Sequence, residues 1–195
     1  MDGKDRAALE QRIAAALEAQ TLDAAATLAI RGYGPEICGY LQAVVRDEDA
    51  ARDVFSMFAE DLWRGIGGFR QECSLRTWAY KLAWHAAARH FGDPYRARRR
   101  RLATSEAAAL AVEVRSQSRP WQRTSAQSRV ATLRAGLSPD EQTLLTLRID
   151  RRLSWREVAH VLSSDASPTD EATLRKRFER IKARLRDLAV REGLL

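Results

Sequence analysis

The sequence of 195 residues contains little that would build a disulfide-bonded, secreted or membrane-spanning protein. Two cysteines, Cys38 and Cys73, cannot form a disulfide framework, and we expect both to be free thiols in a reducing cytoplasm. No apolar run approaches the roughly 20 residues that cross a bilayer, so direct membrane insertion is not expected. The charged N-terminus, MDGKDRAALEQR, lacks the apolar stretch of a signal peptide. These absences predict a cytoplasmic protein.

Patterns typical of cofactor, metal or catalytic sites are equally scarce. The sequence has no P-loop, no GxGxxG motif and no GxSxG motif. Its histidines, His85, His90 and His160, and its cysteines are too scattered to suggest a zinc site. No paired acid and base and no activated nucleophile stand out. We therefore expect no cofactor, no bound metal and no enzymatic activity, and an enzyme with a helical fold is the least supported interpretation.

Positive charge, in contrast, is abundant and is carried almost entirely by arginine. Lys and Arg total 33 against 26 Asp and Glu, which gives a net charge of +7 and a pI near 10.0. The planar guanidinium of arginine binds phosphates and the edges of guanine. This composition favours a polyanionic partner such as nucleic acid.

Strong helix formers dominate the sequence, and Gly and Pro number only 10 and 5. We predict an all-α protein of two small helical domains, 1–101 and 135–195, joined by a flexible linker at 102–134 in which residues 107–114 could be helical. The turn residues of Arg31–Pro35 are expected to interrupt the helices of the first domain. Residues 5–30 are expected to form one or two helices, and further helices are expected over residues 36–46, 48–64 and 75–91.

Three helix starts organise the C-terminal domain. Ser138 and Ser154 each precede a glutamate three residues later, which is the pattern of a capping box, and Ser167 begins a third such start. A short helix, a turn and a longer basic helix are typical of a helix-turn-helix, whose second helix enters the major groove of DNA. The alternative is a solvated, charged helix that packs in a bundle. The apolar stripe of the last helix is Leu174, Phe178, Ile181, Leu185 and Leu188.

The polar faces of that last helix carry candidate DNA contacts. Thr173, Lys176 and Arg180 share one face at helical spacing. Arg175 and Arg177 flank this face, where they could reach phosphates.

The helix expected over residues 75–91 presents aromatic residues away from its core face. Tyr80, Trp84 and Phe91 form this second stripe. Aromatic side chains beside cations suit stacking on unpaired bases, and the arginine run from Arg89 to Arg101 would follow a phosphate backbone. The alternative is that both faces of the helix are buried between neighbours.

The helix expected over residues 48–64 has the opposite charge. From Glu36 to Asp61 the sequence has seven acids and two arginines, so this face would not be directed at DNA. It is either solvated surface or the docking surface of a basic partner. Docking is favoured because the helix has more apolar bulk than one stripe needs, namely Phe55, Met57, Phe58, Leu62 and Trp63.

Taken together, these segments resemble the extracytoplasmic-function group of bacterial sigma-70-type sigma factors. DEDAARDVFSMFAEDLW is similar to the family's acidic helix. FRQECSLRTWAYKLAWHAAARH is similar to its promoter-melting segment, with His85 and Arg89 in place of the usual Asn and Asp. LSPDEQTLLTLRIDRRLSWREVAHVL, followed by ATLRKRFERIKARLR, is similar to the module that reads the −35 promoter element, with a longer turn at 163–172.

The resemblance implies a specificity subunit of RNA polymerase that makes and breaks no bond itself. Its partners would be the β′ and β subunits of core RNA polymerase, promoter DNA and an anti-sigma factor. The polymerase-binding residues would be Asp49, Asp53, Phe55, Phe58, Asp61 and Trp63. The −10 DNA contacts would be Phe69, Arg70, Ser74, Trp78, Tyr80, Lys81, Trp84, His85 and Arg89. The −35 DNA contacts would be Thr173, Arg175, Lys176, Arg177 and Arg180.

A standalone helix-turn-helix transcriptional regulator with a helical dimerisation domain is the alternative. Such a protein would bind duplex DNA without polymerase. The acidic helix and the aromatic residues outside the core argue against it.

Overall fold

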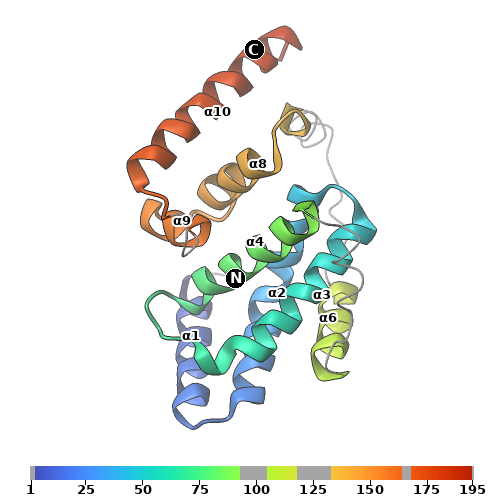
Figure 1. Ribbon diagram of the computed structural model, residues 1–195, viewed down its shortest axis with the longest axis vertical. Coiled ribbons are helices and arrows are strands. Elements are labelled where there is room, and N and C mark those ends of the chain that lie inside the picture. Colours follow the sequence, from blue (N-terminus) through green and yellow to red (C-terminus); the bar gives the residue numbers. More distant parts are fainter. Residues whose placement is uncertain (1–2, 93–104, 118–132, 164–167, 195) are drawn as a thin grey trace. The chain divides into compact units, whose positions relative to one another are not determined.

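A computed structural model describes residues 3–92, 105–117, 133–163 and 168–194 (Figure 1). The described residues contain helices and no strand, so the predicted all-α class is confirmed. The chain divides into two compact units, Met1–Arg119 and Pro120–Leu195. The arginine run at 96–101 lies outside the described residues. Within the described residues, every helix is too short or too polar to cross a membrane.

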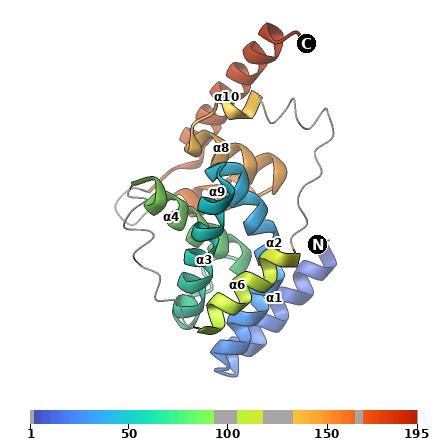
Figure 2. The same cartoon turned by 90° about the vertical axis from the view of Figure 1, so that its right-hand side faces the viewer.

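Unit 1 is a bundle centred on one long helix. Helix α2 (Leu22–Val45) packs against every other helix described in this unit. Figures 1 and 2 show it among these helices. The surrounding helices are α1 (Gly3–Glu18), α3 (Glu48–Gly65), α4 (Leu75–Gly92) and α6 (Ser105–Gln117). A 3₁₀ turn, η1 (Ile66–Gly68), follows α3 and leads into the loop before α4.

Helix α2 continues through Pro35, so the predicted break at Arg31–Pro35 is wrong. A proline inside a helix removes one backbone hydrogen bond and costs about 3 kcal/mol. Here the flanking residues Tyr33 and Ile37 are completely buried on the face that meets the other helices. Burial of such side chains contributes about 1.5–3 kcal/mol each, which offsets the cost of the proline.

Residues 105–117 fall in the predicted linker, of which 107–114 could be helical. They form α6, and this helix is part of unit 1, because it packs against α2 and α3. The helix buries Ala107, Ala111 and Val114. A β-carbon on Gly34 of α2 would lie only 2.8 Å from Cγ1 of Val114, so the absence of a side chain permits this close approach. The guanidinium of Arg115 donates to the backbone carbonyl of Arg52 at 3.0 Å and to the Ser56 hydroxyl at 2.7 Å. Unit 1 therefore extends beyond the predicted boundary at residue 101.

The two predicted capping boxes are both present in unit 2. Ser138 caps α8 (Pro139–Leu145) and Ser154 caps α9 (Trp155–Leu162), each with its glutamate bonded back to the cap. A π-helical turn, η2 (Thr146–Asp150), continues from α8. The long helix α10 (Glu171–Arg191) is capped by Asp170, so it starts later than the predicted Ser167, which lies outside the described residues.

The predicted apolar stripe of α10 is buried in the N-terminal half of the helix and less buried beyond it. Leu174, Phe178 and Ile181 are buried against the rest of unit 2, and α10 packs on α8 and α9. Leu185 and Leu188 are only half-buried. The N-terminal half of α10 is therefore the part that the small core of this unit fixes most firmly.

Candidate nucleic-acid interface

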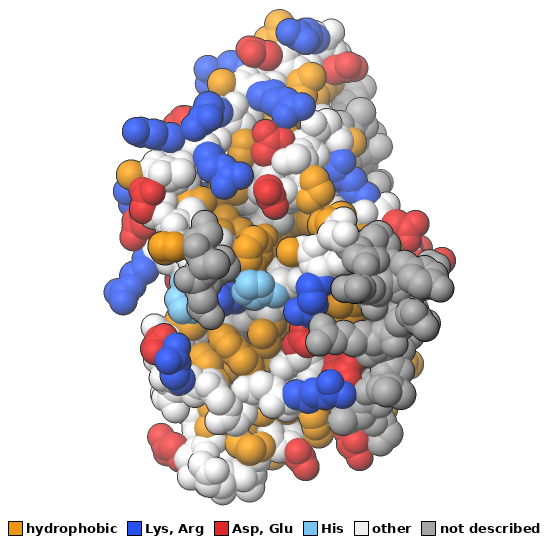
Figure 3. All heavy atoms as spheres, viewed as in Figure 1, with side chains coloured by type: hydrophobic (Ala, Val, Ile, Leu, Met, Phe, Trp, Pro, Cys, Tyr) orange, Lys and Arg blue, Asp and Glu red, His pale blue; other side chains and the backbone are white. Residues whose placement is uncertain are grey.

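The five candidate contacts on α10 all lie on its exposed surface. They are Thr173, Arg175, Lys176, Arg177 and Arg180. Lys and Arg side chains are frequent over the α10 part of unit 2 in the space-filling view (Figure 3). The face that sequence spacing predicted is thus available to a polyanion within this unit.

Asp170 fixes the first turn of that basic helix. Its carboxylate accepts hydrogen bonds from the Thr173 backbone N–H at 2.9 Å and from the Thr173 hydroxyl at 2.6 Å. These bonds from Thr173 hold the pKa of the Asp170 carboxyl below its ordinary value. The hydroxyl of Thr173 is therefore engaged within the protein, whereas the cationic residues that follow it on α10 are exposed.

A cluster of cations around Trp155 was missed by the sequence analysis. The guanidiniums of Arg148 and Arg175 lie 5.0 and 5.6 Å from the centroid of the indole ring. The indole packs edge-on against Phe178, which anchors it to the core of unit 2. Arg175 also forms an ion pair with Glu171 at 2.7 Å. Because Arg148 and Trp155 belong to different helical segments, no spacing along one helix could reveal this cluster.

The candidate −10 contacts in unit 1 are mostly accessible. The rings of Phe69 and Trp78 are 5.2 Å apart and those of Trp84 and His85 are 4.9 Å apart, and all four side chains are half-buried. Lys81 and Arg89 are also half-buried, and Arg70 and Ser74 are exposed. One surface of α4 and its preceding loop thus combines aromatic rings with cations.

Tyr80 is the exception, because it has no exposed surface. Its ring packs edge-on against Tyr40 at 5.6 Å between centroids, and the Arg76 guanidinium lies 5.4 Å from its centroid. The prediction that Tyr80 faces a DNA base is therefore wrong for this structure. Part of the second aromatic stripe of α4 is core, as the alternative interpretation proposed.

Some of the candidate polymerase contacts on α3 are accessible to a partner and others are buried. Asp49 is exposed, and Asp53, Asp61 and Trp63 are half-buried. Asp61 is ion-paired with Arg89 of α4.

Phe55 and Phe58 have no exposed surface, and their rings pack 5.5 Å apart in the core. Their prediction as partner contacts is wrong, because the apolar bulk in excess of one stripe serves the packing of α3 against its neighbouring helices.

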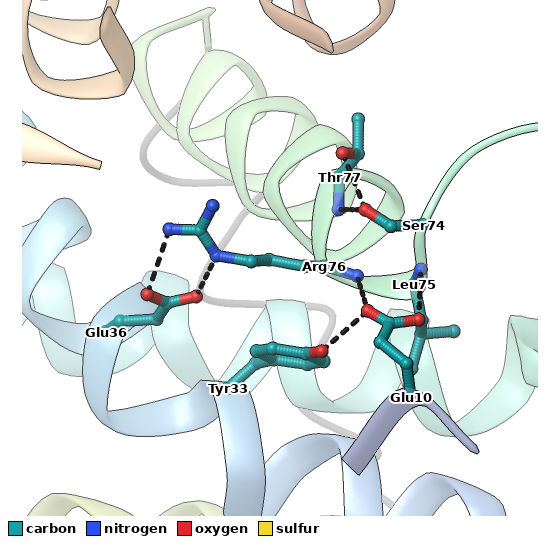
Figure 4. A network of polar contacts seen from close by, with 7 residues as sticks. All are labelled: Glu10, Tyr33, Glu36, Ser74, Leu75, Arg76 and Thr77. Carbon is teal, nitrogen blue, oxygen red and sulfur yellow. Dashed lines mark hydrogen bonds and ion pairs between the residues drawn. The ribbon is translucent and has the colours of Figure 1, made fainter. Parts of the chain in front are cut away.

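A partly buried polar network lies beneath the first turn of α4 (Figure 4). The Arg76 guanidinium donates two hydrogen bonds to the Glu36 carboxylate, at 2.7 and 3.1 Å. The Glu10 carboxylate accepts from the backbone N–H groups of Leu75 and Arg76, each at 3.0 Å, and from the Tyr33 hydroxyl at 2.5 Å. The sequence analysis missed this network because its members come from three helices.

Part of the chain matches a family of known proteins, and most of it can be aligned with two relatives. Residues 29–101 match the family described as sigma-70 region 2, a stretch that contains α3 and α4. The chain is 28% identical over 145 residues to the RNA polymerase sigma-H factor of Pseudomonas aeruginosa, covering 69% of this chain and 73% of that protein. It is 28% identical over 152 residues to the RNA polymerase sigma factor YlaC of Bacillus subtilis, covering 76% of this chain and 86% of that protein.

Proposed function

We propose a promoter-specificity role for this chain, which belongs to the sigma-70 family of bacterial RNA polymerase sigma factors and is of the extracytoplasmic-function type. In this role it acts in the cytoplasm, directs core RNA polymerase to promoters and catalyses no reaction itself. The observation that carries the proposal lies within the stretch that matches region 2. There, α3 with its acidic surface and α4 with its aromatic, cationic surface pack against each other and against α2.

The polymerase docking surface is proposed to be the exposed side of α3. Asp49 and Asp53 are one helical turn apart, and Trp63 supplies a half-buried aromatic side chain near the other end of the helix. Aromatic residues at the centre of an interface, with complementary charges around them, give both affinity and orientation. The partner that fits this surface is a basic face of core RNA polymerase, on its β′ subunit.

The −10 element is proposed to bind at α4 and the loop before it. Extruding a base from a duplex costs a few kcal/mol, and stacking on an aromatic ring returns about 1–3 kcal/mol per base. Phe69, Trp78 and Trp84 provide rings for this purpose, and Lys81 provides a nearby cation for the phosphates. Tyr80 supports the surface from within the core.

The −35 element is proposed to bind at α10, with α9 and α10 acting as a helix-turn-helix. Lys176 and Arg180 would reach base edges, and Arg175 and Arg177 would bind phosphates. The cations around Trp155 extend the positive surface. An anti-sigma factor is included among the proposed partners, beside core polymerase and promoter DNA.

Co-purification with core RNA polymerase tests the proposal. The tagged wild-type chain is compared with an Asp49→Arg, Asp53→Arg variant and with a control that reverses two other exposed acids, Glu18→Arg and Asp23→Arg. We expect stoichiometric polymerase with the wild type and the control, and loss of polymerase with the first variant. Equal binding by all three chains would contradict the docking surface. A folded wild-type chain that binds duplex promoter DNA and no polymerase would instead support a standalone regulator.

A further inference from the structure

The first turn of α4 is held by a residue that precedes the stretch matching region 2. We propose that Glu10 of α1 is a positioning residue for promoter opening, because its carboxylate fixes the N-terminus of the helix that carries the −10 contacts. This inference rests on the proposed function and assigns a role to α1 within it. Glu10 itself contacts no DNA in this proposal, since it acts through the backbone of α4.

Each of the first three backbone N–H groups of α4 has a hydrogen-bond acceptor outside the helix. The first N–H groups of any helix lack partners within the helix and carry partial positive charge. In α4 the Glu10 carboxylate accepts from the N–H groups of Leu75 and Arg76, each at 3.0 Å. The Ser74 hydroxyl accepts from the Thr77 N–H at 3.1 Å. A carboxylate from one helix and a hydroxyl from the adjoining loop thus share the cap.

Two further contacts hold the Glu10 carboxylate and the α4 turn in place (Figure 4). The Tyr33 hydroxyl donates to Glu10 at 2.5 Å from a completely buried ring. Burial of the phenol, followed by its hydrogen bond to Glu10, raises the pKa of Tyr33 above its ordinary value, so the hydroxyl keeps its proton and remains a donor. On the next side chain of the turn, the ion pair between Arg76 and Glu36 ties α4 to α2.

The proposed −10 surface begins at this turn. The loop from Phe69 enters α4 through Ser74, and the Phe69 ring packs on Trp78, which lies one turn into the helix. A change in the position of the first turn therefore moves Phe69 and Trp78 together. The docking surface on α3 has its own anchors, because Phe55 and Phe58 pack in the core. Loss of the cap is thus expected to impair promoter opening and to leave polymerase docking intact.

A near-isosteric substitution, Glu10→Gln, tests the proposal in the full chain bound to core RNA polymerase. The amide retains one acceptor oxygen and loses the charge, so the side-chain volume is preserved while the cap is weakened. The matched control is Glu18→Gln, the same change at an exposed position of the same helix. The DNA is a promoter fragment selected from a randomised library with the wild-type holoenzyme. The readouts are affinity for core polymerase and the rate of strand opening, measured by a fluorescent base analogue in the −10 region.

We expect Glu10→Gln to slow strand opening by about five- to tenfold, the effect of losing one helix cap, while Glu18→Gln stays within about twofold of the wild type. Affinity for core polymerase is expected to be the same for all three chains. Equal opening rates for Glu10→Gln and the wild type would overturn the inference. A parallel fall in core affinity and opening rate would also overturn it, because that result indicates general destabilisation. Failure of the wild-type chain itself to bind polymerase would refute the proposed function instead.

Discussion

The guanidinium of Arg89 on α4 is ion-paired with the carboxylate of Asp61 on α3. The sequence analysis assigned these residues to two different partners, Asp61 to polymerase and Arg89 to DNA. In the structure they join the helix proposed to bind polymerase to the helix proposed to bind the −10 element. Both side chains are about one third exposed, 35% for Asp61 and 38% for Arg89, so solvent screens their attraction.

A double-mutant cycle with Asp61→Asn and Arg89→Gln should give a small coupling free energy of unfolding. We expect about 0.2–1 kcal/mol, as for other partly exposed ion pairs, decreasing as salt is added. Urea unfolding of the four chains measures it. A coupling that is independent of salt would show that the pair is less accessible to ions than its exposure indicates.

The ion pair of Arg76 and Glu36 should behave very differently, because the Arg76 guanidinium is buried and Glu36 is mostly covered. Removing one member of a buried ion pair leaves an uncompensated charge and costs about 3–5 kcal/mol, so we expect Arg76→Met to lower the free energy of unfolding by that amount. The control is Arg52→Met, which removes an exposed guanidinium paired with Glu48 and should cost no more than about 1 kcal/mol. Denaturant unfolding compares the two variants. Adding Glu36→Leu to Arg76→Met should recover part of the loss, and no recovery would argue against the pair.

Alanine substitutions at Phe58 and Trp63 should affect different properties, the first the stability of the fold and the second the affinity for polymerase. Phe58 is completely buried, so Phe58→Ala is expected to cost about 3–5 kcal/mol of folding free energy. Trp63 is half-buried on the proposed docking surface, so Trp63→Ala should reduce affinity for core polymerase by about 2 kcal/mol or more. Unfolding curves and a binding titration on both variants test the distinction. Equal losses of stability would place Trp63 in the core.

Asp170 should make the start of α10 sensitive to acid. Hydrogen bonds from Thr173 lower the pKa of its carboxyl below the ordinary value of 3.8. The folded form therefore binds its proton less readily than the unfolded form, and the stabilisation is complete above pH 3.8 and is lost as pH falls through the lowered value. The protection of the Thr173 amide against exchange, measured relative to the unfolded chain at the same pH, should fall below this range. Asp170→Asn, which keeps a good N-cap, should remove this pH dependence.

The features of the fold that depend on residues close together in the sequence could be predicted from the sequence. The capping boxes at Ser138 and Ser154 each involve two residues three positions apart, so the local sequence is enough to predict them. The bounds of α3 and α4 were predicted to within one residue for the same reason, because strong helix formers end at glycines. The exposed cations of α10 followed from the spacing of its apolar stripe.

Contacts between helices were the part that could not be predicted. The helix through Pro35 is stable because of side chains that it buries against other helices, which local propensity does not include. The position of Tyr80 depends on Tyr40, and the cap on α4 comes from Glu10, 65 residues before Leu75. The assignment of α6 to a linker failed similarly, because its apolar face becomes apparent only once α2 and α3 are in place.

The packing of α6 on α2 also bears on the order in which the helices of unit 1 unfold. Helix α6 lies beside Gly34 of α2, and Glu113 of α6 is bonded to Arg31 across 82 residues of sequence. Such distant contacts form late, because closing a long chain segment costs entropy that nearby contacts do not require. Helices α1 and α2, in contrast, are consecutive and share the core. We therefore expect α6 to detach from unit 1 before the remaining helices separate, with its amides exchanging in a distinct, less protected step.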